Sequence, residues 1–113
     1  MGSVTLMNGP MPGGYQRLMT VQIVDDSLVF TIEEWGGRVD EWLELTRAYR
    51  DTYEYGYAVP KRSIKRFLKT LGLDWDGSLD ALKHEWSGPE QSEALIEHLK
   101  AGTDTMGIEF TVL

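Results

Sequence analysis

The alternation of apolar and polar residues predicts a β-hairpin over about residues 18–34. β-branched and aromatic residues at every second position are typical of strands that bury one face. The apolar positions of the two runs are Val21, Ile23, Leu28, Phe30 and Ile32. Asp25, Asp26 and Ser27 separate the runs, and these residue types favour a tight turn between antiparallel strands.

The same alternation returns over residues 107–113, where Ile108, Phe110 and Val112 alternate with polar residues. This pattern predicts a C-terminal strand. Residues 55–59, between the hairpin and this strand, have an aromatic-rich pattern that fits either a short strand or a connection.

Apolar residues at three- and four-residue steps predict helices in the region between the hairpin and the last strand. The expected helices cover residues 38–53, residues 60–71, a short stretch after Ser78, and residues 89–102. Pro60 and Pro89 fit the first turns of helices, because the missing N–H has no helical partner there. Ser78 is expected to cap the short helix, and Ser87 has the capping-box spacing to Glu90.

The first eighteen residues differ in composition from the rest of the chain. Residues 8–14 contain three glycines and two prolines, which are incompatible with a helix or an inner strand and predict a flexible loop. Residues 4–7 fit a short edge strand. We therefore expect residues 1–18 to form a flexible N-terminal arm or an edge strand, and residues 19–113 to form a single compact domain.

The order of these elements predicts an α+β domain. Its sheet is expected to be small and mostly antiparallel, because no strand–helix–strand alternation repeats along the chain. The hairpin at about 18–34 and the C-terminal strand 107–113 are expected to pair in this sheet. Three or four helices are expected to pack against it.

The composition excludes several classes of protein. With 42% hydrophobic residues, four Trp and five Tyr among 113 residues, the chain is too apolar for a disordered acidic tail. The absence of Cys excludes disulfides, thiolate metal sites and thiol nucleophiles. Neither a membrane-spanning apolar run nor a secretory signal is visible, so we expect a cytoplasmic protein with no membrane partner.

The formal net charge of −7 is unevenly distributed along the chain. Residues 25–54 carry nine acids and three arginines (−6), and residues 74–113 carry nine acids and two lysines (−7). Residues 55–73 carry five basic residues and no acid (+5). We interpret this basic segment as internal charge balance against its acidic neighbours, with the binding of an anionic partner as the alternative.

The sequence lacks the spacings of common catalytic motifs. Ser63 and Ser78 do not lie in a nucleophile elbow, and His84 is not followed by the second histidine of a zinc-protease helix. We therefore expect no catalytic residue, no metal ion and no cofactor. The alternative is an unrecognised enzyme or ligand-binding domain, in which His84 or His98 meets carboxylates in a cleft.

The leading hypothesis is a small acidic cytosolic module that binds a protein partner with a basic surface and acts by occluding it. An inhibitor, an immunity protein or antitoxin, and a phage anti-defence protein would all fit this description. Clustered acids and surplus aromatic residues support it, because exposed Trp and Tyr with an acidic rim are typical of binding hot spots. The residues expected to form this surface are Trp35, Trp75, Asp74, Asp76, Glu33 and Glu34.

The main alternative is a nucleic-acid-binding or regulatory module that uses the basic helix 60–71. The charged residues of this helix lie opposite its apolar stripe, so a cationic face follows from helical geometry. These residues are Lys61, Arg62, Lys65, Arg66 and Lys69. A homodimer formed through an edge strand or an exposed tryptophan is a further alternative.

Overall fold

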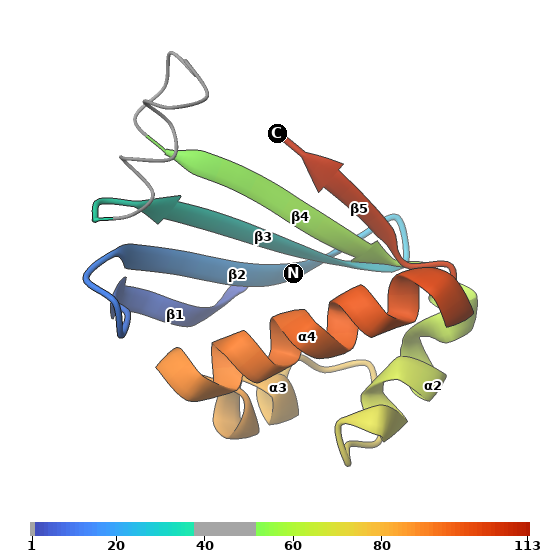
Figure 1. The fold of residues 1–113 in the computed structure, drawn as a ribbon. Helices are drawn as coiled ribbons and strands as arrows, with labels where there is room; N and C mark the ends of the chain where they lie inside the picture. Colours follow the sequence, from blue (N-terminus) through green and yellow to red (C-terminus); the bar gives the residue numbers. More distant parts are fainter. Residues whose placement is uncertain (1, 38–51) are drawn as a thin grey trace.

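A computed structural model describes residues 2–37 and 52–113 (Figure 1). Five strands form one antiparallel sheet, and their order across the sheet is their order along the chain. The strands are β1 (Val4–Pro10), β2 (Gln16–Val24), β3 (Ser27–Trp35), β4 (Tyr53–Val59) and β5 (Glu109–Val112). The prediction of an α+β fold with a mostly antiparallel sheet is confirmed.

The predicted hairpin is also confirmed, as β2 and β3. Val24 pairs with Ser27, so the turn has only two central residues, Asp25 and Asp26. Both have positive φ, 49° and 66°, as a type I′ turn requires. This turn fixes the register: in every β2–β3 pair the two residue numbers add up to 51, as they do for Val24 and Ser27.

The pairing of the last strand differs from the prediction. β5 pairs with β4 and not with the hairpin, because the ambiguous residues 55–59 belong to a full strand that lies between them. The sheet therefore has five strands, rather than the hairpin and one further strand. β5 is also shorter than the predicted strand 107–113.

Residues 8–14 were predicted to be a flexible loop, and this is wrong for their first part. Residues 8–10 continue β1. This strand lies at the edge of the sheet and has a neighbour on one side only, so the missing N–H of Pro10 is tolerated there. The tight turn that follows is closed by a hydrogen bond from the Met11 N–H to the Tyr15 carbonyl oxygen, at 2.7 Å.

Three helices among the described residues lie between β4 and β5 in sequence and cover one face of the sheet (Figure 1). They are α2 (Lys61–Thr70), α3 (Asp80–Glu85) and α4 (Pro89–Thr105). Residues 38–51 of the predicted helix 38–53 lie outside the described residues, and Tyr53 is the first residue of β4.

The predicted helix caps are met only in part. The Ser78 hydroxyl accepts a hydrogen bond from the Asp80 N–H at 3.1 Å, at the start of α3. Ser87 does not cap α4: its hydroxyl donates to the Lys83 carbonyl oxygen, and Gly88 with φ 107° takes the cap position instead. A capping box therefore does not form, because the chain enters α4 through a backbone conformation that only glycine adopts easily.

The core lies between the inner face of the sheet and the apolar stripes of the helices. Phe30 of β3 packs edge-on against Phe67 of α2, with ring centroids 6.2 Å apart. From α4, Leu95 and Leu99 are fully buried. Two charged residues, Arg17 and Glu34, lie on the same inner face as these apolar side chains.

Candidate functional site

A buried ion pair crosses the β2–β3 hairpin. Arg17 and Glu34 pair directly in the strand register, and both project to the inner face of the sheet. Only 2% of Arg17 and 9% of Glu34 is exposed to solvent. The Arg17 Nε donates to Glu34 Oε2 at 2.8 Å. The inner face of the hairpin is therefore interrupted by a desolvated pair of charges.

The guanidinium of Arg17 also connects the hairpin to α4. It donates to the Ser92 hydroxyl at 3.0 Å, to the Glu93 carboxylate at 2.8 Å and to the Tyr15 hydroxyl at 3.2 Å. The Tyr55 hydroxyl of β4 donates to Glu34 at 3.1 Å. In the described part of the chain, no buried side-chain N or O atom lacks a hydrogen-bond partner. This network therefore satisfies the charges that the fold buries.

The network also shifts the pKa values of Arg17, Tyr55 and Tyr15. Burial lowers the pKa of Arg17, but the hydrogen bonds and charges of Glu93 and Glu34 outweigh burial and raise it above the ordinary value. Burial raises the pKa of the Tyr55 hydroxyl, and the negative charge of Glu34 raises it further. Burial likewise raises the pKa of Tyr15. Arg17 is thus held charged and both tyrosines are held neutral.

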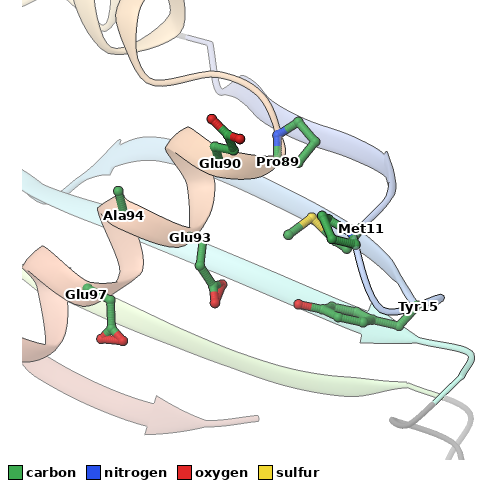
Figure 2. Close-up of a pocket in the computed structure, with 8 residues that line it drawn as sticks. Met11, Tyr15, Pro89, Glu90, Glu93, Ala94 and Glu97 are labelled. Carbon is green, nitrogen blue, oxygen red and sulfur yellow. The ribbon is translucent and has the colours of Figure 1, made fainter.

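A cleft of about 450 Å³ opens beside this network, between the β1–β2 turn and the first half of α4 (Figure 2). Its lining residues are Met11, Pro12, Tyr15, Pro89, Glu90, Glu93, Ala94 and Glu97. Figure 2 shows the Tyr15 ring reaching from the turn toward the helix, with its hydroxyl on the side of Glu93. The cleft therefore has apolar walls at its turn end and carboxylates along its helix side, and we call it the acidic cleft.

Three glutamates of α4 give the acidic cleft its charge. Glu90, Glu93 and Glu97 recur at three- and four-residue steps, which places them on one side of the helix. Glu93 is held by Arg17, and Glu97 lies 3.9 Å from Lys100, at an exposed position. Glu90 forms no ion pair with any described residue. A long side chain with an apolar stem and a cationic end would match both the walls and the carboxylates.

The six residues that were predicted to form one acidic and aromatic surface lie in three different places. Glu33 and Trp35 lie on the outer face of β3, opposite the helices, and both are partly exposed. Glu34 lies on the inner face in the ion pair with Arg17. Asp74, Trp75 and Asp76 lie between α2 and α3, at the other end of the molecule from the end of β3 (Figure 1).

The two aspartates between α2 and α3 are exposed, and Trp75 packs partly buried against the core. The Asp76 carboxylate accepts the Ser78 N–H at 2.9 Å, so it supports the turn before α3. This contact gives Asp76 a structural role that the sequence pattern alone did not indicate.

The basic residues of α2 lie together on an exposed face, as predicted from helical geometry. Lys61, Arg62, Lys65, Arg66 and Lys69 are all exposed. Among the described residues, one ion pair involves this face: Lys61 Nζ lies 3.9 Å from Asp26 Oδ2, between side chains that are 78% and 74% exposed. Asp40, Glu41, Glu44 and Asp51 of the neighbouring acidic block lie outside the described residues, so internal charge balance stays an interpretation.

The two histidines lie outside the acidic cleft. His84 is exposed on α3, and His98 of α4 packs edge-on against Trp86, with ring centroids 5.7 Å apart. Within residues 2–37 and 52–113, no three His, Asp or Glu side chains are grouped so that they could hold a metal ion. No helix in the same part of the chain combines the length and the apolar character needed to span a membrane.

The sequence reasoning missed Arg17 and the glutamates of α4. Arg17 is in phase with Met19 and Val21 on the apolar face of its strand, and Glu34 is in phase with Ile32. A charge in phase with apolar residues on each strand of a hairpin was the available signal.

Comparison of the chain with protein-family models, with curated proteins and with solved structures finds no match.

Proposed function

We propose that this protein is an acidic cytoplasmic binding module that occludes a basic surface of a protein partner. The acidic cleft is the observation that carries the proposal. Its three glutamates are set along apolar walls, and its volume of about 450 Å³ suits one or two side chains rather than a macromolecule. The cleft thus fits a Lys or Arg side chain that projects from the partner.

The chemistry of the cleft supports this partner class. The aliphatic stem of Lys or Arg would lie against Met11 and Pro89, and its charged end would meet Glu90 or Glu97. Arg17 holds the Glu93 carboxylate at the cleft wall, so this acid does not have to be ordered when a ligand binds. An inhibitor, an immunity protein, an antitoxin or an anti-defence protein would act by such occlusion.

Charge reversal at three separate surfaces tests the proposal. The cleft variant is Glu90→Lys/Glu97→Lys. Two controls address the surfaces that the sequence suggested, Asp74→Lys/Asp76→Lys between the helices and Glu33→Lys/Glu54→Lys on the outer face of the sheet. Each double variant replaces two negative charges by two positive ones, so all three have the same formal charge of −7 + 4 = −3.

The measurement is affinity capture from lysate of the source cells, followed by association kinetics with the captured protein at two salt concentrations. We expect the wild type and both controls to retain a stoichiometric protein, and the cleft variant to lose it. The association rate of the wild type should fall as salt is added, because opposite charges steer the encounter. Capture that survives in the cleft variant but is lost in either control moves the binding surface away from the cleft. Recovery of no stoichiometric protein by the wild type argues against the function itself.

A second candidate function is nucleic-acid binding by α2. The observation that favours it is the exposed cationic face, on which Lys65, Arg66 and Lys69 form no ion pair with any described residue. Such a face can contact a phosphate backbone, and each contact makes the affinity more sensitive to salt. Binding of DNA and RNA should be measured at low and moderate salt, with Lys65→Glu/Arg66→Glu as the matched variant. Binding that is undetectable, or that is unchanged in this variant, excludes α2 as a nucleic-acid site.

A further inference from the structure

The two edges of the sheet differ in how they are protected. Proteins cover or interrupt exposed edge strands, because unpaired backbone groups can recruit another chain. The edge at β1 is covered: the Gly88 N–H donates to the Leu6 carbonyl oxygen at 2.9 Å, and the Lys83 ammonium donates to the carbonyl oxygen of Thr5. A register irregularity between Thr5 and Met7 interrupts the same strand. The β1 edge is therefore covered at Thr5 and Leu6, whose carbonyl oxygens already accept hydrogen bonds.

The edge at β5 has none of these protections among the described residues. β5 contains no Lys, no Pro and no register irregularity, and β4 is its single neighbour in the sheet. Phe110 is 47% exposed, Val112 54% and Leu113 51%, which makes three of the four exposed large hydrophobic side chains of the described chain. Exposed apolar side chains thus gather at this edge of the sheet.

The hydrogen-bond register shows which backbone groups this edge presents. The Leu113 N–H donates to the Glu54 carbonyl oxygen at 2.9 Å, and the two residues are in register. Inward and outward backbone groups alternate along an antiparallel strand. Thr111 and Glu109 therefore also bond toward β4, whereas the N–H and C=O groups of Phe110 and Val112 point to the open edge.

A depression beside the open edge can receive a side chain. It has a volume of about 350 Å³, and Tyr57, Lys100, Thr103 and Phe110 line it. The rings of Tyr57 and Phe110 lie 5.1 Å apart and form its aromatic side. Phe110 and Val112 pair with Tyr57 and Tyr55, so all four project to the inner face of the sheet. An apolar side chain on the inner face of an added strand would enter this depression.

We infer that β5 is a strand-addition site for an extended segment of a protein partner, with apolar side chains on one face and basic side chains on the other. The inference rests on the proposed function in that the partner is a protein. Charge decides the occupant: Glu109 projects to the outer face of β5, and Glu54 lies on the same face of β4. A second copy carries the same charge of −7, and its residues 107–113 bring no basic side chain to Glu109. Main-chain hydrogen bonds would supply affinity and the depression would supply specificity.

A synthetic peptide of alternating Lys and apolar residues tests the inference (Lys-Val-Lys-Phe-Lys-Val-Lys, capped at both ends). The decisive variant is Val112→Pro, which removes an outward N–H and leaves the ladder to β4 intact. Val112→Thr is the matched control, because it keeps both the N–H and the β-branched shape. A peptide with Glu in place of Lys tests the charge requirement. Binding is followed by fluorescence anisotropy, and the unfolding transition of each variant verifies the fold.

We expect the wild type and Val112→Thr to bind the Lys peptide, and we expect the affinity of Val112→Pro to be lower by at least about tenfold. Amide resonances of the wild-type protein should shift at Phe110 and Val112 on binding, which tests the site without any substitution. Equal binding by a folded Val112→Pro variant, or equal binding of the Glu peptide, overturns the inference. Absence of binding by the wild type overturns it too.

Two further results separate this inference from the proposed function. Peptide binding that is lost in Glu90→Lys/Glu97→Lys but kept in Val112→Pro places the peptide in the acidic cleft. That result overturns strand addition and supports the proposed function. Concentration-dependent self-association of the wild type that Val112→Pro abolishes identifies a second copy as the occupant, which overturns the choice of partner. Light scattering measures this directly.

Discussion

Replacement of Arg17 by Met should destabilise the fold strongly, and the reason is the carboxylate that it leaves behind. The side chains of Arg17 and Glu34 are 3% and 12% exposed, and 2.7 Å separates their closest charged atoms. Met has a similar length and is apolar, so it can fill much of the same space. Among the described residues, Glu34 would then keep the hydroxyl of Tyr55 as its one side-chain donor. The cost is therefore that of an uncompensated buried charge.

The loss of unfolding free energy in Arg17→Met depends on which of the Arg17 contacts are buried away from water. The contact to Glu93 contributes little, because that carboxylate is 57% exposed. Loss of one partner of a buried pair costs about 3–5 kcal/mol. Domains of this size are stable by roughly 5–15 kcal/mol, so Arg17→Met should still fold at room temperature. Removal of both charges in Arg17→Met/Glu34→Met should recover most of the loss, because a well-packed apolar pair replaces a buried ion pair at little cost.

Urea unfolding followed by Trp fluorescence and circular dichroism measures these differences. At a typical slope of about 2 kcal/mol per molar urea, Arg17→Met should lower the midpoint by about 2 M. Lys61→Met is the control, since it removes only the exposed contact to Asp26 and should change stability by less than about 0.5 kcal/mol. A cost of less than about 1 kcal/mol for Arg17→Met, or a double variant no more stable than Arg17→Met, would show that Glu34 is not left as an uncompensated buried charge.

Three other changes test the electrostatics, the packing and the turn. Tyr55→Phe should reduce the loss of stability above about pH 10. Burial and the charge of Glu34 raise the Tyr55 pKa in the folded protein, so the unfolded chain loses this proton at a lower pH than the folded protein does. In the wild type this difference lowers the free energy of unfolding by up to about 1.4 kcal/mol per pH unit, and Tyr55→Phe removes it. Urea midpoints from about pH 9 to 11 measure it, and equal slopes in both proteins would contradict the pKa shift. Gly102→Ala should destabilise the fold by about 1–3 kcal/mol in spite of its better helix propensity, because the new methyl group meets Ile108 Cδ1. Adding Ile108→Val, which lacks that atom, should recover part of the loss, as measured by thermal unfolding. Asp26→Gly should raise the free energy of unfolding by up to about 1 kcal/mol, because φ is 66° there, and the urea midpoint should rise accordingly. A lower midpoint would show that the aspartate makes a stabilising contact.

The elements with strong periodicity were predictable from the sequence, and the pairing of the last strand was not. The hairpin was visible because the alternation of Val21 and Phe30 and the two aspartates of the turn agree on one structure. Residues 55–59 were ambiguous because Tyr55, Gly56 and Tyr57 bury both faces of β4, which removes the alternation. Without β4 in the sheet, the hairpin was the nearest available partner for β5. One ambiguous strand therefore changed the predicted topology.

The buried ion pair was within reach of the sequence. A two-residue turn at Asp25 and Asp26 pairs residues whose numbers add to 51, and this sum places Arg17 opposite Glu34. Both residues are in phase with the apolar positions of their strands, so a buried cross-strand pair follows from the register alone. The acidic cleft was out of reach, because it needs the β1–β2 turn to lie against the start of α4. That contact depends on tertiary packing, which no local pattern encodes.

The separation of charge in the fold changes how the net charge of −7 bears on the choice of partner. The acidic cleft and α2 lie toward opposite ends of a molecule that measures 41 × 25 × 25 Å (Figure 1). Electrostatic interactions in water are screened over about 8 Å at physiological salt. A partner that approaches one end is therefore governed by the charges of that end rather than by the sum over the chain. The net charge does not exclude a phosphate backbone at α2, and it does not by itself favour a basic protein; the local carboxylates and apolar walls of the cleft do.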